Sequence, residues 1–207
     1  MKVTPVGTRT GHFAIFLFCG LLPWMAIHEG VLRSATTITD NANLVKKLRF
    51  PAEILVASVV LAAVLHEAIA VLIFVGSLVW LGEFSWRGLP VLLVAAPLQI
   101  GLTLGLGLLV ASVHVFFRDT AQVLGLVLNA WFYLTPIVYP LALVPERFQG
   151  LIEHNPLAGL VGLYRQAFLG GSGALEAAVP LAVWTVVLLG AGWWLFRRLK
   201  PAFVDEI

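Results

Sequence analysis

The sequence predicts an all-α fold, a polytopic bundle of helices that spans a membrane, and three observations support this prediction. Hydrophobic residues make up 60% of the 207 positions and charged residues only 12%, whereas a soluble domain is about half apolar and a quarter charged. The mean hydropathy is +0.96. The apolar residues gather in long runs without the period-two alternation of transmembrane strands, so helices are the structure that fits a bilayer here.

Five runs are long enough to cross a membrane, because a helix needs about 20 residues to span a hydrocarbon layer of about 30 Å. The predicted spans are residues 13–33, 54–81, 89–117, 121–143 and 175–196. They form a single membrane domain over residues 1–207, with polar segments at 40–51 and 144–171. The first run follows basic residues as a secretory signal does, but it lacks an A-x-A-like cleavage site, so we interpret it as a retained span.

The polar segment between the first two spans contains the stretch "NANLVKKLRFP". Its basic residues are Lys46, Lys47 and Arg49. Pro51 disfavours helical geometry at the residue before it, which separates this stretch from the second span. We expect a short independent helix with an apolar stripe of Leu44, Val45 and Leu48. The basic face of this helix could rest on anionic headgroups or dock on a partner protein.

Lysine and arginine in the connections predict the orientation, because cytoplasmic loops carry an excess of both. One side of the membrane holds eight of the 13: Arg33, Lys46, Lys47, Arg49, Arg118, Arg197, Arg198 and Lys200. That side is predicted to be the cytoplasm, which puts the N terminus outside. Lys2 and Arg9 oppose this arrangement. A further span upstream would resolve the conflict, so we expect the functional gene product to extend beyond Met1 by an amphipathic segment and one more apolar run.

The second and third spans carry residues that stand out from their apolar surroundings. His66 and Glu67 fall near the middle of the second span, where an ionised side chain costs about 2.5 to 3.5 kcal/mol. We expect Glu67 either to hydrogen-bond a neighbouring helix or to face a wet translocation path. His66 and Glu67 point about 100° apart on a helix, so they do not form a single site. In the third span, Gly101 and Gly105 form a G-x-x-x-G face for close helix packing.

The turn "FFRDT" joins the third span to the fourth. Arg118 and Asp119 either mark the end of one span and the start of the next, or transmit motion from a partner. The negative charge of Asp119 is placed to stabilise the N terminus of the next helix. The fourth span contains further candidates for a translocation path at every fourth position: Trp131, Thr135 and Tyr139. Such a face suits sugar rings or a sliding lipid tail, and it equally suits packing on lipid or a neighbouring helix. Pro136 predicts a kink in this helix.

The second polar segment, residues 144–171, is too long for a simple turn and too polar to span. Asn155 and Pro156 break it into two halves, for which we expect short amphipathic helices that lie at the outer interface or dip into it. Arg165 in the second half could anchor this segment through an ion pair, or it could bind an anionic head group.

Several classes of function are disfavoured by the composition and the motifs. The net charge of +2 is too small to indicate a nucleic-acid partner. No G-x-x-x-x-G-K-[ST] loop occurs in the sequence, so this chain is not expected to bind or hydrolyse ATP itself. Cys19 is the only cysteine, and no metal site is expected. A membrane enzyme would need convergent polar groups, and the sequence shows only separate pairs: His28/Glu29, Arg118/Asp119 and Glu153/His154.

Two pairs of sequence blocks resemble a known family. They are "LFCGLLPWMAI" followed by "NANLVKKLRFPAEIL", and "VFFRDTAQVLGLVLNAWFYLTPIVYP" followed by "VPERFQGLIEHNPLAGLVGLYRQAFLG". They resemble the permease subunit of bacterial ABC-2 type exporters for polysaccharides, O-antigen and teichoic acids. The resemblance extends from Phe13 to about Phe196 and includes the residues, the order and the spacing of the blocks. Members of that family normally begin with an amphipathic helix and a further span, for which this sequence has no counterpart.

The resemblance implies a permease that exports a lipid-linked polysaccharide or a related cell-envelope glycan across the bacterial inner membrane. It implies a homodimer of permeases driven by two separate ABC ATPase subunits, which bind the ATP and Mg²⁺. The basic stretch is the coupling helix in this family, and its expected contacts are Asn43, Leu44, Lys46, Lys47 and Arg49. The outer segment caps the channel, and the expected gate residues are Asn155, Pro156 and Arg165. Related permeases also often carry an acidic residue near the place of Glu67. An exporter of drugs or other lipids, a non-transport scaffold and an inactive fragment are the alternatives.

Overall fold

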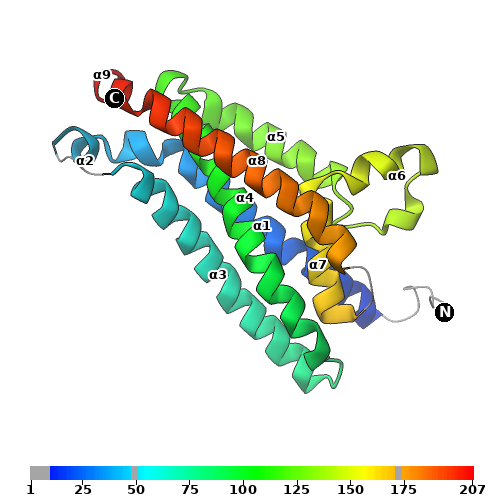
Figure 1. The fold of residues 1–207 in the computed structure, drawn as a ribbon. Helices are drawn as coiled ribbons and strands as arrows, with labels where there is room; N and C mark the ends of the chain where they lie inside the picture. The colour runs from blue at the N-terminus through cyan, green and yellow to red at the C-terminus, as the bar shows by residue number, and fades with distance from the viewer. Residues whose placement is uncertain (1–9, 48–50, 171–173) are drawn as a thin grey trace.

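The computed structural model describes residues 10–47, 51–170 and 174–207, and every regular element within these residues is helical (Figure 1). The predicted all-α membrane fold is confirmed. Four helices are long and apolar enough to cross a membrane. They are α1 (Thr10–Asp40), α3 (Glu53–Trp80), α4 (Leu89–Phe116) and α8 (Ala174–Leu199).

Shorter helices connect the four long ones. At one end of the bundle lie α2 (Ala42–Lys47), η3 (Lys200–Ala202) and α9 (Phe203–Glu206), and at the other end η1 (Trp86–Gly88) joins α3 to α4 (Figure 1). The connection from α4 to α8 contains α5 (Thr120–Leu134), η2 (Leu141–Leu143), α6 (Glu146–Glu153) and α7 (Pro156–Leu169). We call the end with α2 and α9 the inner end, and the opposite end the outer end, after the predicted orientation.

The central helix of the bundle is α4, which packs against α1, α3, α7 and α8. Two of its glycines permit close contact with α8. A Cβ atom on Gly101 would lie 2.7 Å from Thr185 Cγ2, and a Cβ atom on Gly105 would lie 2.5 Å from the backbone N of Leu189. Both distances are well below the optimal separation of nonbonded atoms. The predicted G-x-x-x-G packing face is therefore confirmed, and its partner is α8.

The predicted fourth span is shorter than the sequence suggested. Its helix, α5, has 15 residues and ends at Leu134 rather than at residue 143, so it reaches only about 22 Å at about 1.5 Å per residue. Pro136 has no backbone N–H and disfavours helical geometry at Thr135, whose φ of −98° and ψ of 136° are extended. The predicted kink at Pro136 is wrong, because the helix ends there.

The outer segment contains two helices that differ in burial. None of the residues of α6 is buried, whereas nine residues of α7 are buried, and α7 packs against α1, α4 and α8. At its far end, Gly88 of η1 leaves no room for a Cβ atom beside the carbonyl of Ala167. The second half of the outer segment is therefore part of the bundle core, a position that the predicted pair of interfacial helices did not include.

Candidate functional site

Asn155 joins the start of α7 to the end of α5. Its Oδ1 accepts hydrogen bonds from Trp131 Nε1 and from the backbone N of Leu157, both at 3.0 Å. Its Nδ2 donates to Thr135 Oγ1 at 2.9 Å. Asparagine is a preferred N-cap residue and proline a preferred first helical residue. The pair Asn155–Pro156 therefore starts α7 and fixes it to α5 at the same point.

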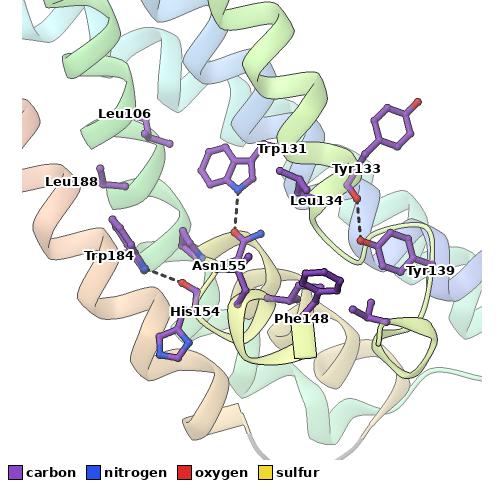
Figure 2. Close-up of a pocket in the computed structure, with 14 residues that line it drawn as sticks. Leu106, Trp131, Tyr133, Leu134, Tyr139, Phe148, His154, Asn155, Trp184 and Leu188 are labelled. Carbon is purple, nitrogen blue, oxygen red and sulfur yellow. Dashed lines mark hydrogen bonds between the residues drawn. The ribbon is translucent and has the colours of Figure 1, made fainter. Parts of the chain in front are cut away.

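A cavity of about 620 Å³ lies beside this junction, between α5, α6 and α8 (Figure 2). Its volume is in the range of sites for small molecules. Aromatic and aliphatic side chains form most of its wall, among them Trp131, Leu134, Tyr139, Phe148, Trp184 and Leu188, while Tyr133 contributes its backbone carbonyl and its ring points away. We call it the aromatic cavity.

Polar groups at the wall of the aromatic cavity bond to one another. Trp184 Nε1 donates to the carbonyl of His154, and the Tyr139 hydroxyl donates to the carbonyl of Tyr133, both at 2.9 Å (Figure 2). The indole of Trp131 is used by Asn155. Because these donors are already occupied, the cavity presents ring faces, which suit an apolar chain or the C–H face of a sugar.

The structure brings together part of the predicted path and part of the predicted gate. Trp131 and Tyr139 line the aromatic cavity together with Asn155 and Pro156. Thr135 is fully buried and does not line the cavity, but its hydroxyl bonds to two lining residues, the carbonyl of Trp131 and the amide of Asn155. The prediction that the three path residues share one helix face is wrong, because α5 ends before Thr135 and Tyr139 reaches the cavity from the following loop.

Arg165, the third predicted gate residue, lies apart from the aromatic cavity. It donates from Nη2 to the carbonyl of Ile137 at 2.7 Å, and its guanidinium carbon lies 3.6 Å from the ring centroid of Phe16. A second cavity of about 620 Å³ is lined by Arg165, Glu153 and Glu176, among other residues. Within the described residues, Arg165 is held by a carbonyl and an aromatic ring, and none of the ion pairs includes it.

Glu67, the remaining path candidate, is enclosed by α3, α4 and α7. Gln99 Nε2 donates to Glu67 Oε2. The hydroxyl of Tyr164 lies 2.7 Å from Glu67 Oε1 and 2.8 Å from Gln99 Oε1. The three residues are 7%, 1% and 4% exposed, in the order Glu67, Gln99, Tyr164. This geometry agrees with the first expectation for Glu67, a hydrogen bond to a neighbouring helix.

A cluster of charged and polar side chains lies on the outside of α1 and α3. Glu29 Oε1 is 2.8 Å from Arg33 Nη1 and 3.4 Å from His66 Nδ1. The side chains of Glu29, Arg33 and His66 are 35%, 54% and 60% exposed. His66 lies at the midpoint of α3, which runs from residue 53 to residue 80. We call these three residues the mid-membrane polar cluster. Arg33 lies within α1, which continues to Asp40, and not at the end of a span that was predicted to stop at residue 33.

The predicted coupling segment is partly described as α2, at the inner end. Its exposed members are Asn43, Leu44 and Lys46, while the side chain of Lys47 and the whole of Arg49 lie outside the described residues. Val45 packs against a buried cluster that joins the ends of the long helices and includes Ile38, Val56, Val115, Phe196 and Phe203. The short helix contacts α1 and α9, and through Val45 it rests on the buried cluster in which the inner ends of the long helices meet.

The predicted inner turn lies at the same end of the bundle. Arg118 and Asp119 are exposed between α4 and α5. Asp119 directly precedes α5, but its side chain makes no capping hydrogen bond. Close by in the fold, Lys200 and Glu53 form an ion pair of 2.6 Å that links the end of α8 to the start of α3.

Sequence reasoning missed several residues that the structure places at these sites. Gln99 is a lone amide in an apolar run, and this signal could have indicated a polar partner inside the membrane. Tyr164 and Trp184 carry no such signal, because aromatic residues are common in membrane helices. His66 and Glu29 were noted only as members of unrelated pairs, since 37 positions separate them in the sequence.

The sequence is similar to that of membrane transport proteins. The O-antigen export system permease protein RfbA of Klebsiella pneumoniae is 28% identical over 198 residues, which cover 94% of this chain and 75% of that protein. RfbA of Myxococcus xanthus is 29% identical over 199 residues, with coverage of 95% and 76%. The polysialic acid transport protein KpsM of Escherichia coli is 28% identical over 198 residues, with coverage of 94% and 76%. A family model described as ABC-2 type transporter matches residues 4–169, which span α1 to α7, and the chain therefore belongs to this family of multi-pass membrane proteins.

Proposed function

We propose that this chain is the transmembrane permease subunit of an ATP-driven exporter that moves a lipid-linked polysaccharide or related cell-envelope glycan across the bacterial inner membrane. Membership of the ABC-2 type transporter family supports the transport role. The similarity to permeases for O-antigen and polysialic acid supports a polysaccharide as the substrate. The observation in the structure that carries the proposal is the mid-membrane polar cluster.

The mid-membrane polar cluster is unsuited to contact with lipid. An ionised side chain at this depth costs about 2.5 to 3.5 kcal/mol, and such groups normally face a partner or a water-filled cavity. A different stripe of α3, formed by Leu61, Leu65 and Leu72, is exposed and entirely apolar, so it can face lipid. The face with His66 and Glu29 is therefore the one that suits a hydrated path, which a hydrophilic glycan needs and an apolar drug or lipid does not.

Energy for export is proposed to come from two separate ABC ATPase subunits that bind ATP and Mg²⁺, in a complex with two copies of this chain. The proposed docking site is the predicted coupling segment, Asn43, Leu44, Lys46, Lys47 and Arg49, of which the first three are exposed on α2. Because α2 rests on the buried cluster at the inner ends of four long helices, a displacement of α2 would move those ends together. Arg118 and Asp119 are exposed at the same end and are proposed to take part in this transmission.

A cysteine at position 66 is expected to react with a charged, membrane-impermeant thiol reagent about tenfold faster than a cysteine at position 65. The reacting species is the thiolate, which forms in a hydrated environment and not against lipid. His66→Cys and Leu65→Cys would be compared in the purified complex in lipid nanodiscs, after removal of the buried Cys19 by a Cys19→Ala substitution. The rate of modification is measured by mass spectrometry.

Leu65 is a matched control because it is adjacent to His66, lies at the same depth and is similarly exposed, at 62%. Equally slow modification at both positions would contradict the hydrated path. It would instead indicate that lipid or another dry helix covers the cluster, as in an exporter of apolar compounds or a scaffold.

Reversal of charge in α2 is expected to weaken binding of the ATPase subunit. A double substitution Lys46→Glu and Lys47→Glu removes two cations from the proposed docking site, and rim charges mainly affect association. The amount of ATPase that co-purifies with the permease is the measurement, and the amount of permease in the membrane fraction is the control for insertion. If co-purification stays at the wild-type level, α2 does not dock the ATPase through these charges and serves only as a headgroup anchor.

A further inference from the structure

Three side chains from three helices form a closed ring inside the membrane domain. Glu67 comes from α3, Gln99 from α4 and Tyr164 from α7, and each side chain contacts the other two. All three are buried, and they lie far apart in the sequence, at separations of 32, 65 and 97 positions. Because the ring joins elements that are distant along the chain, it fixes their relative positions.

The number of hydrogens in this ring determines the protonation state of Glu67. The ring has three contacts, one between a nitrogen and an oxygen atom and two between oxygen atoms. Each contact needs one hydrogen, so the ring needs three. The Gln99 amide can place one hydrogen in the ring and the Tyr164 hydroxyl can place one. The third must come from the carboxyl group of Glu67, because the Tyr164 hydroxyl cannot donate to Glu67 and to Gln99 at the same time.

This count does not depend on how the amide of Gln99 is oriented. In one orientation Glu67 donates to Tyr164, Tyr164 donates to the carbonyl of Gln99, and the amide donates to the second carboxyl oxygen. In the flipped orientation the direction of all three bonds is reversed. Both arrangements need a hydrogen on Glu67, and a carboxylate would leave two acceptor oxygens facing each other in either case.

Within the part of the chain that the structure describes, none of the ion pairs or hydrogen bonds of Glu67 involves a basic side chain that would stabilise a carboxylate. The ring borders a pocket of about 150 Å³ whose other lining residues are all apolar: Val64, Ala68, Val71, Leu92 and Ala96. The basic residues next to two ring members in the sequence have other partners: His66, which follows Val64 and Leu65 and precedes Glu67, lies beside Glu29, and Arg165, which follows Tyr164, is bound to the carbonyl of Ile137. A buried charge without a partner is strongly disfavoured.

We propose that Glu67 is a protonated carboxylic acid in the folded protein, and that its proton closes a ring of three hydrogen bonds that positions α7 against α3 and α4. Gln99 and Tyr164 are then positioning residues for α7, the helix that begins at the predicted outer gate. The ring requires no particular substrate, so it holds whether or not the chain exports a polysaccharide.

Infrared spectroscopy of the protein purified in a detergent that has no carbonyl group tests this proposal directly. A protonated carboxylic acid has a C=O stretching band at higher frequency than a carboxylate. At about pH 7, far above the ordinary pKa of Glu of about 4.3, the wild-type protein is expected to show this band and the Glu67→Gln variant to lack it. Glu83→Gln is the matched control, because Glu83 is exposed, and this variant is expected to keep the band.

Further variants distinguish the contribution of the Glu67 hydrogen from that of side-chain packing alone. Glutamine at position 67 can supply the third hydrogen through its amide, so Glu67→Gln is expected to unfold at the wild-type temperature, while Glu67→Ala and Tyr164→Phe unfold at lower temperatures. In either orientation of Gln99, Tyr164→Phe removes the hydrogen-bond partner of one carboxyl oxygen of Glu67, and it is expected to shift the C=O band to higher frequency. A wild-type spectrum without the band, or a band that Glu67→Gln leaves unchanged, would overturn the proposal.

Discussion

A Gly105→Ala variant is expected to lose about 1 to 3 kcal/mol of unfolding free energy, as overpacked sites commonly do. The added Cβ atom would lie 2.5 Å from the backbone N of Leu189 and 2.6 Å from the backbone C of Leu188. Backbone atoms cannot rotate away as a flexible side chain can, so α4 and α8 must separate. This contact holds together the two helices that pack most extensively in the bundle, and its loss is expected to lower the unfolding temperature in detergent.

Gly190→Ala is the matched control for this prediction. Gly190 lies in the same pair of helices, in α8, and an added Cβ atom there meets no atom within 4 Å. Alanine is favoured over glycine in a helix by about 0.8 to 1 kcal/mol, so this variant is expected to be as stable as the wild type or more stable. Equal losses in the two variants would show that close packing between α4 and α8 is not what Gly105 provides.

Replacing Asn155 by alanine is expected to destabilise the outer end of the protein by about 2 to 4 kcal/mol. The change removes the N-cap of α7, worth about 1 kcal/mol, and it removes the hydrogen bond to the partly buried Trp131 Nε1, where the net loss for one bond is about 0.5 to 1.5 kcal/mol. The bond to Thr135 is lost as well. Thermal unfolding measures the total, and the fluorescence of Trp131, in a background that lacks the other tryptophans, reports the change at the aromatic cavity.

Asn155→Ser separates the two contributions. A serine side chain can cap α7 but is too short to reach Trp131, so it is expected to restore about 1 kcal/mol and no more. Full recovery with serine would show that the bonds to α5 contribute nothing to stability. An alanine variant as stable as the wild type would contradict the whole account of Asn155 as the link between α5 and α7.

The lengths of the apolar runs predicted the four long helices, because burying backbone polar groups in lipid leaves few alternatives to a helix. Pro136 was noted, but the end of α5 was not predicted. A proline can either kink a helix or terminate it, and the packing around the proline decides which of the two occurs. Asn155 and Pro156 were expected at a break and do start α7. The ring around Glu67 could not be predicted, because nothing local relates Gln99 to a tyrosine 65 positions away.

The attachments of α7 restrict how the outer end can move. Asn155 fixes its first turn to α5, and nine residues later, about 14 Å along the axis, Tyr164 ties it to α3 and α4. The adjacent Arg165 attaches α7 to α1 as well, because its guanidinium group lies over the ring of Phe16. Because α7 is attached to other helices near both of its ends, neither end can act as a hinge. Any widening of the outer end therefore requires α7 to move together with the helices to which it is attached, α1, α3, α4 and α5, and not as a separate hinged segment.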